Sequence, residues 1–263
     1  MPRTLQLVAG TVNAGGAGFN TVAAAPGDTF TVASGVSEGA INLEQVWAAG
    51  AVTDMVRIYS PRMHDNNQGM RIQVGTQKYR PLLPWGVDQP LYPADTPTFQ
   101  TDATGAGQTG LLAMYEYLDL PGANPRLASW SDISGRIEQI SGVEVDATAS
   151  AAVGTYGAGV ALNAANDNFK ANRDYALLGY TVNVGCLGVG ITGPDTSNYR
   201  IGGPGDPDPA LTHETFVRTS VDTGRAFIPI IAANNRAATL LQIVDVAAST
   251  AVHVSLVLAL LKQ

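Results

Sequence analysis

The polar loop "HDNNQG" at residues 64–69 places a histidine beside an aspartate, the residue types used in acid–base catalysis and metal binding. Either chemistry needs partners from elsewhere in the fold, and a histidine in such a loop is more often simply exposed. His213 precedes Glu214 in "THETF", which reads as a strand, where neighbouring side chains point to opposite faces. His253 lies in the last apolar run, which favours a partly buried imidazole with a hydrogen-bond partner over a ligand.

Two aspartates in "GGPGDPDPA", Asp206 and Asp208, are the weak calcium candidates of this sequence. Carboxylates at this spacing can share a calcium ion, although a solvated, proline-stiffened loop is the commoner use of such a segment. No pair of carboxylates can be assigned to glycoside hydrolysis, because their separation is a property of the folded chain. We therefore expect no catalytic residue, no cofactor and no enzyme, and rank a carboxylate-dependent β-sandwich hydrolase last.

The segment "GVGITG" at residues 188–193 formally fits a dinucleotide-binding glycine pattern. That pattern works only where a helix begins at its end, so that the helix N-terminus faces the pyrophosphate. Pro194, Asp195 and a polar loop follow instead, which excludes the nucleotide interpretation. The single cysteine, Cys186, is expected in a buried strand and excludes an intrachain disulfide.

Composition favours β-structure with many loops. Of 263 residues 45% are apolar, only 14% are charged, and there are 29 glycines and 15 prolines, which suit helix interiors poorly. Net charge is −7, and the first 56 residues contain one basic residue, Arg3. Without a basic arm to neutralise phosphates, we expect no sequence-specific nucleic-acid binding. The N-terminus has no signal-peptide pattern, and the apolar C-terminal run is too short to span a bilayer as a helix.

The elements that must position these residues are mostly short strands. Ser37–Gly50 is the best helix candidate, with Leu43, Val46 and Trp47 on one face, and residues 129–140 are a weaker one. Strands are predicted from runs rich in Val, Ile, Thr and Tyr between turn residues. These runs are residues 4–9, 28–33, 52–60, 69–74, 110–120, 142–148, 174–192, 212–220, 227–231, 239–247 and 251–261. Such spacing is typical of sandwiches or barrels rather than of alternating strands and helices.

The chain repeats itself weakly, in the same order, at about half its length. "VRIYSP" from Val56 matches "VGITGP" from Val189, and "MRI" around Arg71 matches "YRI" around Arg200. "PLL" at residues 81–83 matches "PII" at 229–231, and each series closes with a long apolar strand. We expect an internal duplication, with a first β-sandwich at residues 1–122 and a second at 123–263.

At the segments "SPRMHDNNQGMRI" (residues 60–72) and "TGPDTSNYRIGGPG" (192–205), within this all-β plan, the chain resembles double jelly-roll major capsid proteins of icosahedral phages and viruses. The resemblance is architectural and covers most of the chain. It implies two eight-stranded jelly rolls side by side, roughly perpendicular to the shell, with one or two short helices. It also implies homotrimers that form pseudo-hexagonal capsomers, often above a lipid membrane. The family has no catalytic site, so it carries over no site residue.

The sequence therefore predicts a viral structural protein that self-assembles into capsomers of an icosahedral virion shell after synthesis in the host cytoplasm. Its expected partners are itself, neighbouring capsomers, other virion proteins and an internal membrane where one is present. The alternative is a lectin-like or host-attachment β-sandwich protein that binds its ligand near Asp65–Asn67 or Asp206–Asp208.

Overall fold

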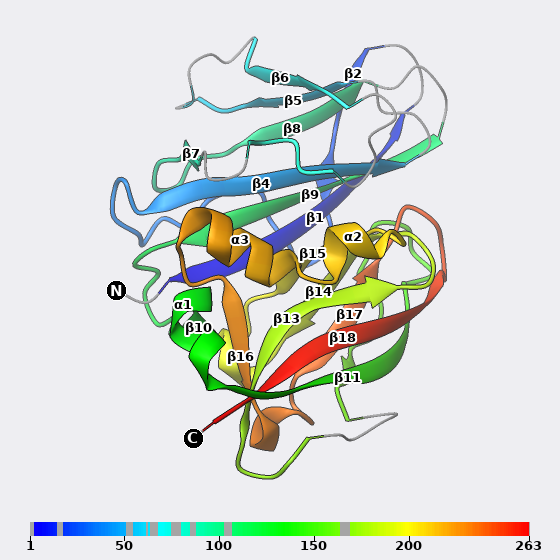
Figure 1. Ribbon diagram of the computed structural model, residues 1–263. Helices are drawn as coiled ribbons and strands as arrows, with labels where there is room; N and C mark the ends of the chain where they lie inside the picture. The colour runs from blue at the N-terminus through cyan, green and yellow to red at the C-terminus, as the bar shows by residue number, and fades with distance from the viewer. Residues whose placement is uncertain are drawn as a thin grey trace.

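The fold is all-β, as the sequence predicts, and Figure 1 shows its strands in stacked layers. The computed structural model describes residues 3–14, 18–50, 55–61, 63, 68–74, 80–84, 88–102, 107–163 and 169–262. The strands of this part of the chain form four sheets, and every pairing is antiparallel. Its helices are short, and none has the length and apolar character needed to cross a bilayer.

The first half of the chain forms one sandwich of two sheets. Its strands are β1 (Thr4–Ala14), β2 (Phe19–Thr21), β3 (Ala23–Ala24), β4 (Ile41–Gly50), β5 (Met55–Tyr59), β6 (Met70–Gln73), β7 (Gln89–Pro90), β8 (Thr98–Asp102) and β9 (Gly107–Tyr117). Sheet 1 has the order β2-β8-β5-β6, and sheet 2 has the order β3-β1-β9-β4-β7. Val46, Ile58, Phe99 and Leu111 lie buried in the core between them.

The second half forms another sandwich. Its strands are β10 (Leu127–Ala128), β11 (Ile137–Thr148), β12 (Val160–Ala161), β13 (Asp174–Val182), β14 (Cys186–Thr192), β15 (Ile201–Gly205), β16 (Ile228–Ala232), β17 (Leu240–Val244) and β18 (Ala251–Leu261). Its α-helices are α1 (Trp130–Ile133), α2 (Pro209–Thr212) and α3 (Thr215–Thr223), and its 3-10 turns are η1 (Ser134–Arg136), η2 (Pro194–Thr196) and η3 (Ala233–Asn235). Sheet 3 has the order β12-β17-β14-β15, and sheet 4 has the order β10-β16-β13-β18-β11.

The two sandwiches share one strand order. Leaving aside the two-residue edge strands β3 and β10, each half has eight strands. The first, eighth, third and sixth of them form one sheet, as β1-β9-β4-β7 in sheet 2 and β11-β18-β13-β16 in sheet 4. The second, seventh, fourth and fifth strands form the other, as β2-β8-β5-β6 in sheet 1 and β12-β17-β14-β15 in sheet 3. Eight antiparallel strands in two facing sheets are a jelly roll. The predicted double jelly roll is therefore confirmed.

The sequence repeats fall on equivalent strands in three of the four cases. "VRIYSP" and "VGITGP" end the fourth strands, Arg71 and Arg200 lie in or beside the fifth strands, and the apolar runs form β9 and β18, the eighth strands. The "PII" repeat is in β16, whereas residues 81–83 lie outside the strands, although Leu82 N donates to Val46 O of β4 at 2.9 Å. The predicted domain boundary after residue 122 lies between β9 and β10 and stays a prediction.

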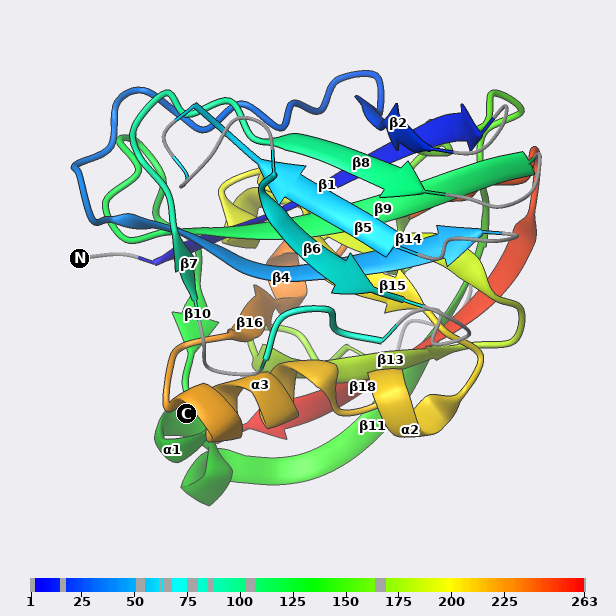
Figure 2. The same ribbon diagram turned by 90° about the horizontal axis from the view of Figure 1, so that it is seen from above.

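The two sandwiches pack against each other through sheet 2 of the first and sheet 3 of the second. Strands β1, β4 and β9 of sheet 2 contact β14 of sheet 3, and β1 and β9 also contact β15. The layers therefore follow the order sheet 1, sheet 2, sheet 3 and sheet 4, from top to bottom in Figure 1. Figure 2 shows the same stack from above, with α2 and α3 along one side. The contact joins unlike sheets, that is, sheets that are not equivalent by strand order in the two jelly rolls. It leaves sheets 1 and 4 on opposite outer sides.

The helix predicted for Ser37–Gly50 is wrong, because residues 41–50 form β4. Leu43 and Val46 point into the core of the first sandwich, whereas Trp47 lies in the apolar cluster on the opposite face. A strand that is covered on both faces loses its simple alternation and reads as a continuous apolar run. The apolar residues on both faces of β4 therefore matched the spacing expected of a helix.

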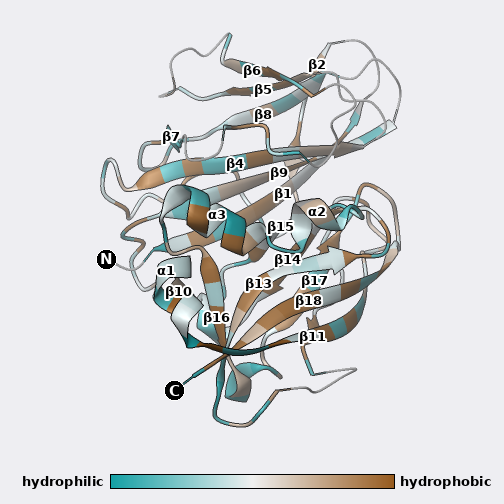
Figure 3. Ribbon diagram, viewed as in Figure 1, coloured by the Kyte–Doolittle hydropathy of each residue, from teal (hydrophilic) through white to brown (hydrophobic). Residues whose placement is uncertain are grey.

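Two strand predictions also fail. Residues 28–33 form no strand, and residues 212–220 lie at the end of α2, in the turn that follows it and in α3. Asp208 caps α2, with its side chain accepting from Ala210 N, and Gly224 ends α3 in the left-handed conformation. The weaker helix at 129–140 contains α1 and η1 but becomes β11 from Ile137. Figure 3 shows β11 alternating in hydropathy, as expected of a strand with one exposed face.

Candidate functional site

The contact between sheets 2 and 3, here called the junction, is apolar at its centre. Leu5, Leu7, Trp47, Leu112 and Met114 project from sheet 2 away from the core of the first sandwich, and all are buried. They belong to the same apolar cluster as the core of the second sandwich. Burial of such side chains stabilises the folded state by about 1.5–3 kcal/mol each. The two sandwiches are therefore joined as tightly as parts of one core.

Glycines let the two sheets approach closely. A Cβ atom on Gly188 would lie 3.0 Å from the Leu112 side chain, and one on Gly110 would lie 2.7 Å from Leu187. Gly188 belongs to the "GVGITG" segment, which runs along β14 and ends at Gly193, just before η2. These glycines thus serve packing at the junction, and no nucleotide-binding helix begins there.

One ionic contact across the junction, here called the balanced contact, is made by Arg200. Its Nη1 lies 2.7 Å from Asp28 Oδ1 of the first sandwich, and its guanidinium lies 3.5 Å from the Tyr156 ring centroid. Arg200 O accepts from Leu7 N at 2.7 Å, and Asp28 Oδ2 accepts from Ala9 N at 3.0 Å. One carboxylate meets one guanidinium, so the charges cancel. Arg200 therefore links the two sandwiches.

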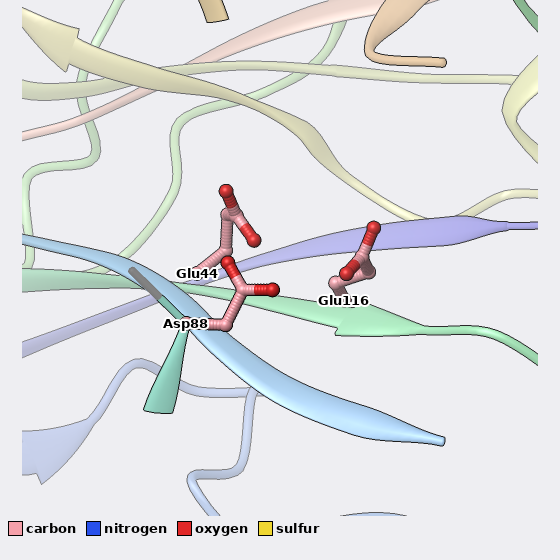
Figure 4. Close-up of side chains that lie close together, drawn as sticks. All are labelled: Glu44, Asp88 and Glu116. Carbon is pink, nitrogen blue, oxygen red and sulfur yellow. The ribbon is translucent and has the colours of Figure 1, made fainter. Parts of the chain in front are cut away.

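A second ionic contact, here called the junction cluster, joins Glu44, Asp88, Glu116 and Arg3 of the first sandwich to Arg225 of the second. Arg225 Nη1 lies 3.2 Å from Glu44 Oε2 and 3.3 Å from Glu116 Oε2, and its Nη2 pairs with Asp88. Arg3 Nε lies 2.7 Å from Glu116 Oε1. Figure 4 shows the three acidic side chains, which come from β4, β9 and the segment before β7.

The junction cluster has more carboxylates than guanidinium groups. One oxygen of each of Glu44, Asp88 and Glu116 lies within 4.8 Å of the others. Burial, followed by a hydrogen bond with Asp88, raises the pKa of Glu44 to about 8. Burial also lowers the pKa of Arg3, whereas the hydrogen bond with Asp88 raises that of Arg225. Carboxylate oxygens could also bind a divalent cation, but here Arg3 and Arg225 already contact them.

The outward face of sheet 1 carries arginines and aromatic side chains. Arg57 and Arg71 are direct partners across β5 and β6, and their guanidinium groups lie 4.3 and 5.5 Å from the Phe19 ring centroid. Arg57 also donates from Nε to Gln100 Oε1 at 2.7 Å. Two like charges directly opposite each other disfavour the pairing, and the aromatic face partly offsets this through cation–π contacts. This outer face is positively charged within an acidic chain.

The outward face of sheet 4 is acidic along β11 and β18. Glu144 and Asp146 are exposed and alternate with buried Val143 and Val145. His253, directly opposite Asp146, has its Nδ1 at 2.7 Å from Asp146 Oδ1, and this hydrogen bond raises the pKa of His253. Ile140 on β11 is 61% exposed, a large apolar side chain left in water.

The calcium candidates Asp206 and Asp208 hold a turn. Asp206 Oδ1 accepts from Asp208 N at 2.8 Å, and Asp208 Oδ1 accepts from Ala210 N at 3.0 Å. In the part of the chain that the structure describes, they belong to no group of three potential metal ligands. Calcium binding by this pair stays a prediction.

The histidine predictions have different outcomes. His213 and Glu214 are not on a strand, and His213 Nε2 lies 4.0 Å from Glu214 Oε2, so the argument that they point apart was wrong. His253 is partly exposed and has the expected hydrogen-bond partner. His64 and Asp65–Asn67 lie outside the described residues. Cys186 is buried, as expected, and burial raises the pKa of its thiol.

Two surface hollows have a size that admits small ligands. One, of about 420 Å³, is lined by Arg126, Arg136 and Asp174 together with apolar residues of β10, β16 and α1. The other, of about 500 Å³, lies between β6 and residues 80–84. Neither hollow is lined by Asp206, Asp208 or the junction cluster.

Sequence reasoning missed the residues of both ionic contacts except Arg200. A signal for Glu44 and Glu116 was present, because each is a lone carboxylate inside an apolar run, "INLEQVWAAG" (residues 41–50) and "GLLAMYEYL" (residues 110–118). Charged residues at such positions are rarely buried without a partner. For Arg225 the sequence contains no such signal, because this residue is not inside an apolar run. It follows α3, a helix that the sequence analysis predicted as a strand.

No family of known proteins matches this sequence, and no curated protein matches it. Among solved structures, the chain is similar to the major capsid protein P2 from bacteriophage PM2, with 8% identity and a TM-score of 0.23, over 99% of this chain and 98% of that chain. It is also similar to the STIV MCP, with 9% identity and a TM-score of 0.20, over 98% of this chain and 87% of that one. TM-scores this low do not establish relationship, so the function proposed below rests on strand order and packing.

Proposed function

We propose that this protein is a structural protein that self-assembles into an icosahedral virion shell, as a viral major capsid protein. The observation that carries the proposal is the pair of jelly rolls with one strand order, stacked so that unlike sheets meet. The central contact between the two jelly rolls is apolar and densely packed. The resemblance to double jelly-roll capsid proteins rests on the same plan.

The stacking within one chain supplies a rule for stacking between chains. Sheet 4 is equivalent to sheet 2 by strand order, and sheet 1 is equivalent to sheet 3. Because sheet 2 packs on sheet 3, the same type of contact would place sheet 4 of one chain on sheet 1 of the next. Such head-to-tail contacts close into rings when the rotation per unit fits a whole turn. Three chains with two sandwiches each would then form a six-part capsomer, the homotrimer expected from the resemblance.

Charge supports this direction of assembly. The free face of sheet 1 carries Arg57 and Arg71, and that of sheet 4 carries Glu144 and Asp146. Complementary faces raise association rates and disfavour wrong pairings, such as sheet 1 on sheet 1. The exposed Ile140 adds apolar area on the acidic face. The proposed partner of each outer face is therefore a second copy of this chain.

Molar mass in solution tests the shell role. Light scattering of purified protein at micromolar concentration, across salt and calcium conditions, is expected to give the mass of a trimer or a larger assembly. A monomer under all of these conditions contradicts the proposal. A glycan array run in parallel tests the lectin-like alternative, which no observation on Asp206 or Asp208 favours; binding by a monomeric protein would replace the shell role with that one.

A further inference from the structure

The junction cluster differs from an ordinary salt bridge because its charges do not balance. It contains three carboxylates, from Glu44, Asp88 and Glu116, and two guanidinium groups, from Arg3 and Arg225. These five residues come from β4, the segment before β7, β9, the residue before β1 and the segment after α3. With all five groups ionised, the cluster would carry one net negative charge.

Burial makes that excess charge costly. The Glu44 and Glu116 side chains are 2% and 1% exposed, and those of Asp88, Arg3 and Arg225 are 13%, 21% and 27% exposed. A carboxylate that leaves water without a counter-charge is strongly destabilised, and neighbouring carboxylates repel one another. A buried pair in this position commonly shares one proton, so that one member stays neutral. Oxygens of Glu44, Asp88 and Glu116 lie within 4.8 Å of one another, so the cluster brings carboxylates together in this way.

We infer that the junction cluster binds one proton, shared by Glu44 and Asp88, and that this proton couples pH to closure of the junction between the two sandwiches. Any state that opens the cluster to water restores ordinary carboxyl groups, which release the proton at neutral pH. By linkage, the closed junction then weakens as the proton is lost. This coupling goes beyond the shell role and does not depend on it.

The sign follows from the pKa of Glu44. Its value in the folded chain is raised to about 8, above the ordinary 4.5, because of burial and the Asp88 hydrogen bond. The folded state therefore holds the proton more tightly than the unfolded state does between these two values. The stabilisation is fully present below pH 4.5 and is lost as the pH rises through about 8. Above that pH both states have lost the proton, and this contribution no longer changes.

A bound cation is the other way to neutralise the excess charge. The contacts between the carboxylates and the guanidinium groups favour a proton over a cation. Calcium takes about 6–8 oxygen ligands, whereas oxygens of all three carboxylates already face guanidinium groups. Arg225 alone contacts Glu44, Asp88 and Glu116. A cation at the centre would lie against this guanidinium and be repelled by it.

The test compares wild type with Glu44→Gln, which imitates the protonated side chain, and with Asp28→Asn in the balanced contact as the matched control. Thermal unfolding is followed from pH 5.5 to 9.5 at fixed salt. The wild-type Tm should fall by about 2–4 °C per pH unit up to about pH 8, relative to Glu44→Gln. Asp28→Asn should have a lower Tm but the wild-type slope. Equal slopes in wild type and Glu44→Gln, or loss of the slope in Asp28→Asn, would overturn the inference.

Two further measurements separate the proton from other causes. The infrared carbonyl band of a protonated carboxyl group should be present in wild type at pH 7 and decline with a midpoint near pH 8; its absence at pH 7 overturns the inference even if Glu44→Gln does not fold. Calcium added at pH 9.5 should leave the wild-type Tm unchanged. Recovery of the low-pH Tm with calcium would instead assign the cluster to a cation.

Discussion

The two ionic contacts across the junction join the same sandwiches but are built differently. In the balanced contact, Arg200 meets the single carboxylate of Asp28, stacks on Tyr156 and is fixed by a main-chain hydrogen bond with Leu7. In the junction cluster, Arg225 contacts three carboxylates, and Arg3 contacts one of them. The first contact has no excess charge, whereas the second has one carboxylate too many.

The difference shows two ways of placing charged groups at an apolar contact, as a matched pair or as an unmatched cluster. Removing water from a matched pair costs free energy that the pair and its hydrogen bonds largely offset, so such a pair mainly fixes register. An unmatched cluster must also bind something else, and a proton is the smallest choice. The balanced contact should therefore act as a fixed link at any pH, and the junction cluster as one that depends on pH.

Arg225→Ala should have the largest effect on stability. It removes the guanidinium that contacts all three carboxylates and leaves Glu44 and Glu116 buried without it. We expect the free energy of unfolding to fall by about 3–4 kcal/mol at pH 7, as for other buried charges that lose a partner. Urea unfolding measures this loss. The loss should shrink at pH 5, where protonation of the carboxyl groups relieves the repulsion; an equal loss at both pH values would contradict the account of the cluster.

Arg200→Ala should cost less, about 2 kcal/mol. Asp28 loses its charged partner but still accepts from Ala9 N, and Tyr156 loses the stacked guanidinium. Urea unfolding should give the same loss at pH 6 and pH 8. Arg200→Lys keeps the charge but not the planar stacking, so it should recover only part of the stability. A pH-dependent loss in Arg200→Ala would remove the distinction between the two contacts.

Charge reversal on the outer faces should change assembly and leave the fold nearly unaltered. Arg57→Glu with Arg71→Glu should shift the free energy of unfolding by no more than about 0.5 kcal/mol, but should reduce the assembled fraction in light scattering. Glu144→Arg with Asp146→Arg should act in the same way. Mixing the two double variants gives complementary faces on different chains and should recover hetero-assemblies. Failure of this recovery, with both variants folded, would count against contact between sheets 1 and 4.

His253→Gln should have the smallest effect, because the imidazole lies on the surface. The hydrogen bond with Asp146 raises the pKa of His253, so its contribution to stability is present below pH 6.5 and is lost as the pH rises through the raised value. Thermal unfolding should show a small Tm difference between wild type and variant at pH 5.5 and none at pH 9. A difference that grows with pH would contradict this assignment.

The sequence predicts the architecture better than individual elements. Short strands between turn residues, such as β6, β16 and β17, can be recognised from the sequence as short runs of β-branched and other apolar residues. The pattern is kept because each strand buries one face or lies in a core. β4 misleads because the first sandwich covers one face and the second covers the other. Residues 212–220 mislead because β-branched residues occur in a helix that tertiary packing against β13 and β16 stabilises.

The candidate site was less predictable, because it exists only where the two sandwiches meet. Arg200 could be singled out because the repeat pairs it with Arg71, and the structure then places the two arginines differently, one at the junction and one on an outer face. Glu116 and Arg225 are 109 residues apart in the chain. Contacts at such separations depend on how the sheets stack, which composition and periodicity do not specify.

Electron microscopy of the purified full chain tests the central claim most directly. Averaged images of particles at micromolar concentration should show closed six-part rings, each made of three chains with two sandwiches, or shells assembled from such rings. The head-to-tail arrangement should place unlike sheets at every contact in the reconstructed ring. Isolated two-part monomers across salt and calcium conditions, or dimers joined through like sheets, would contradict the claim.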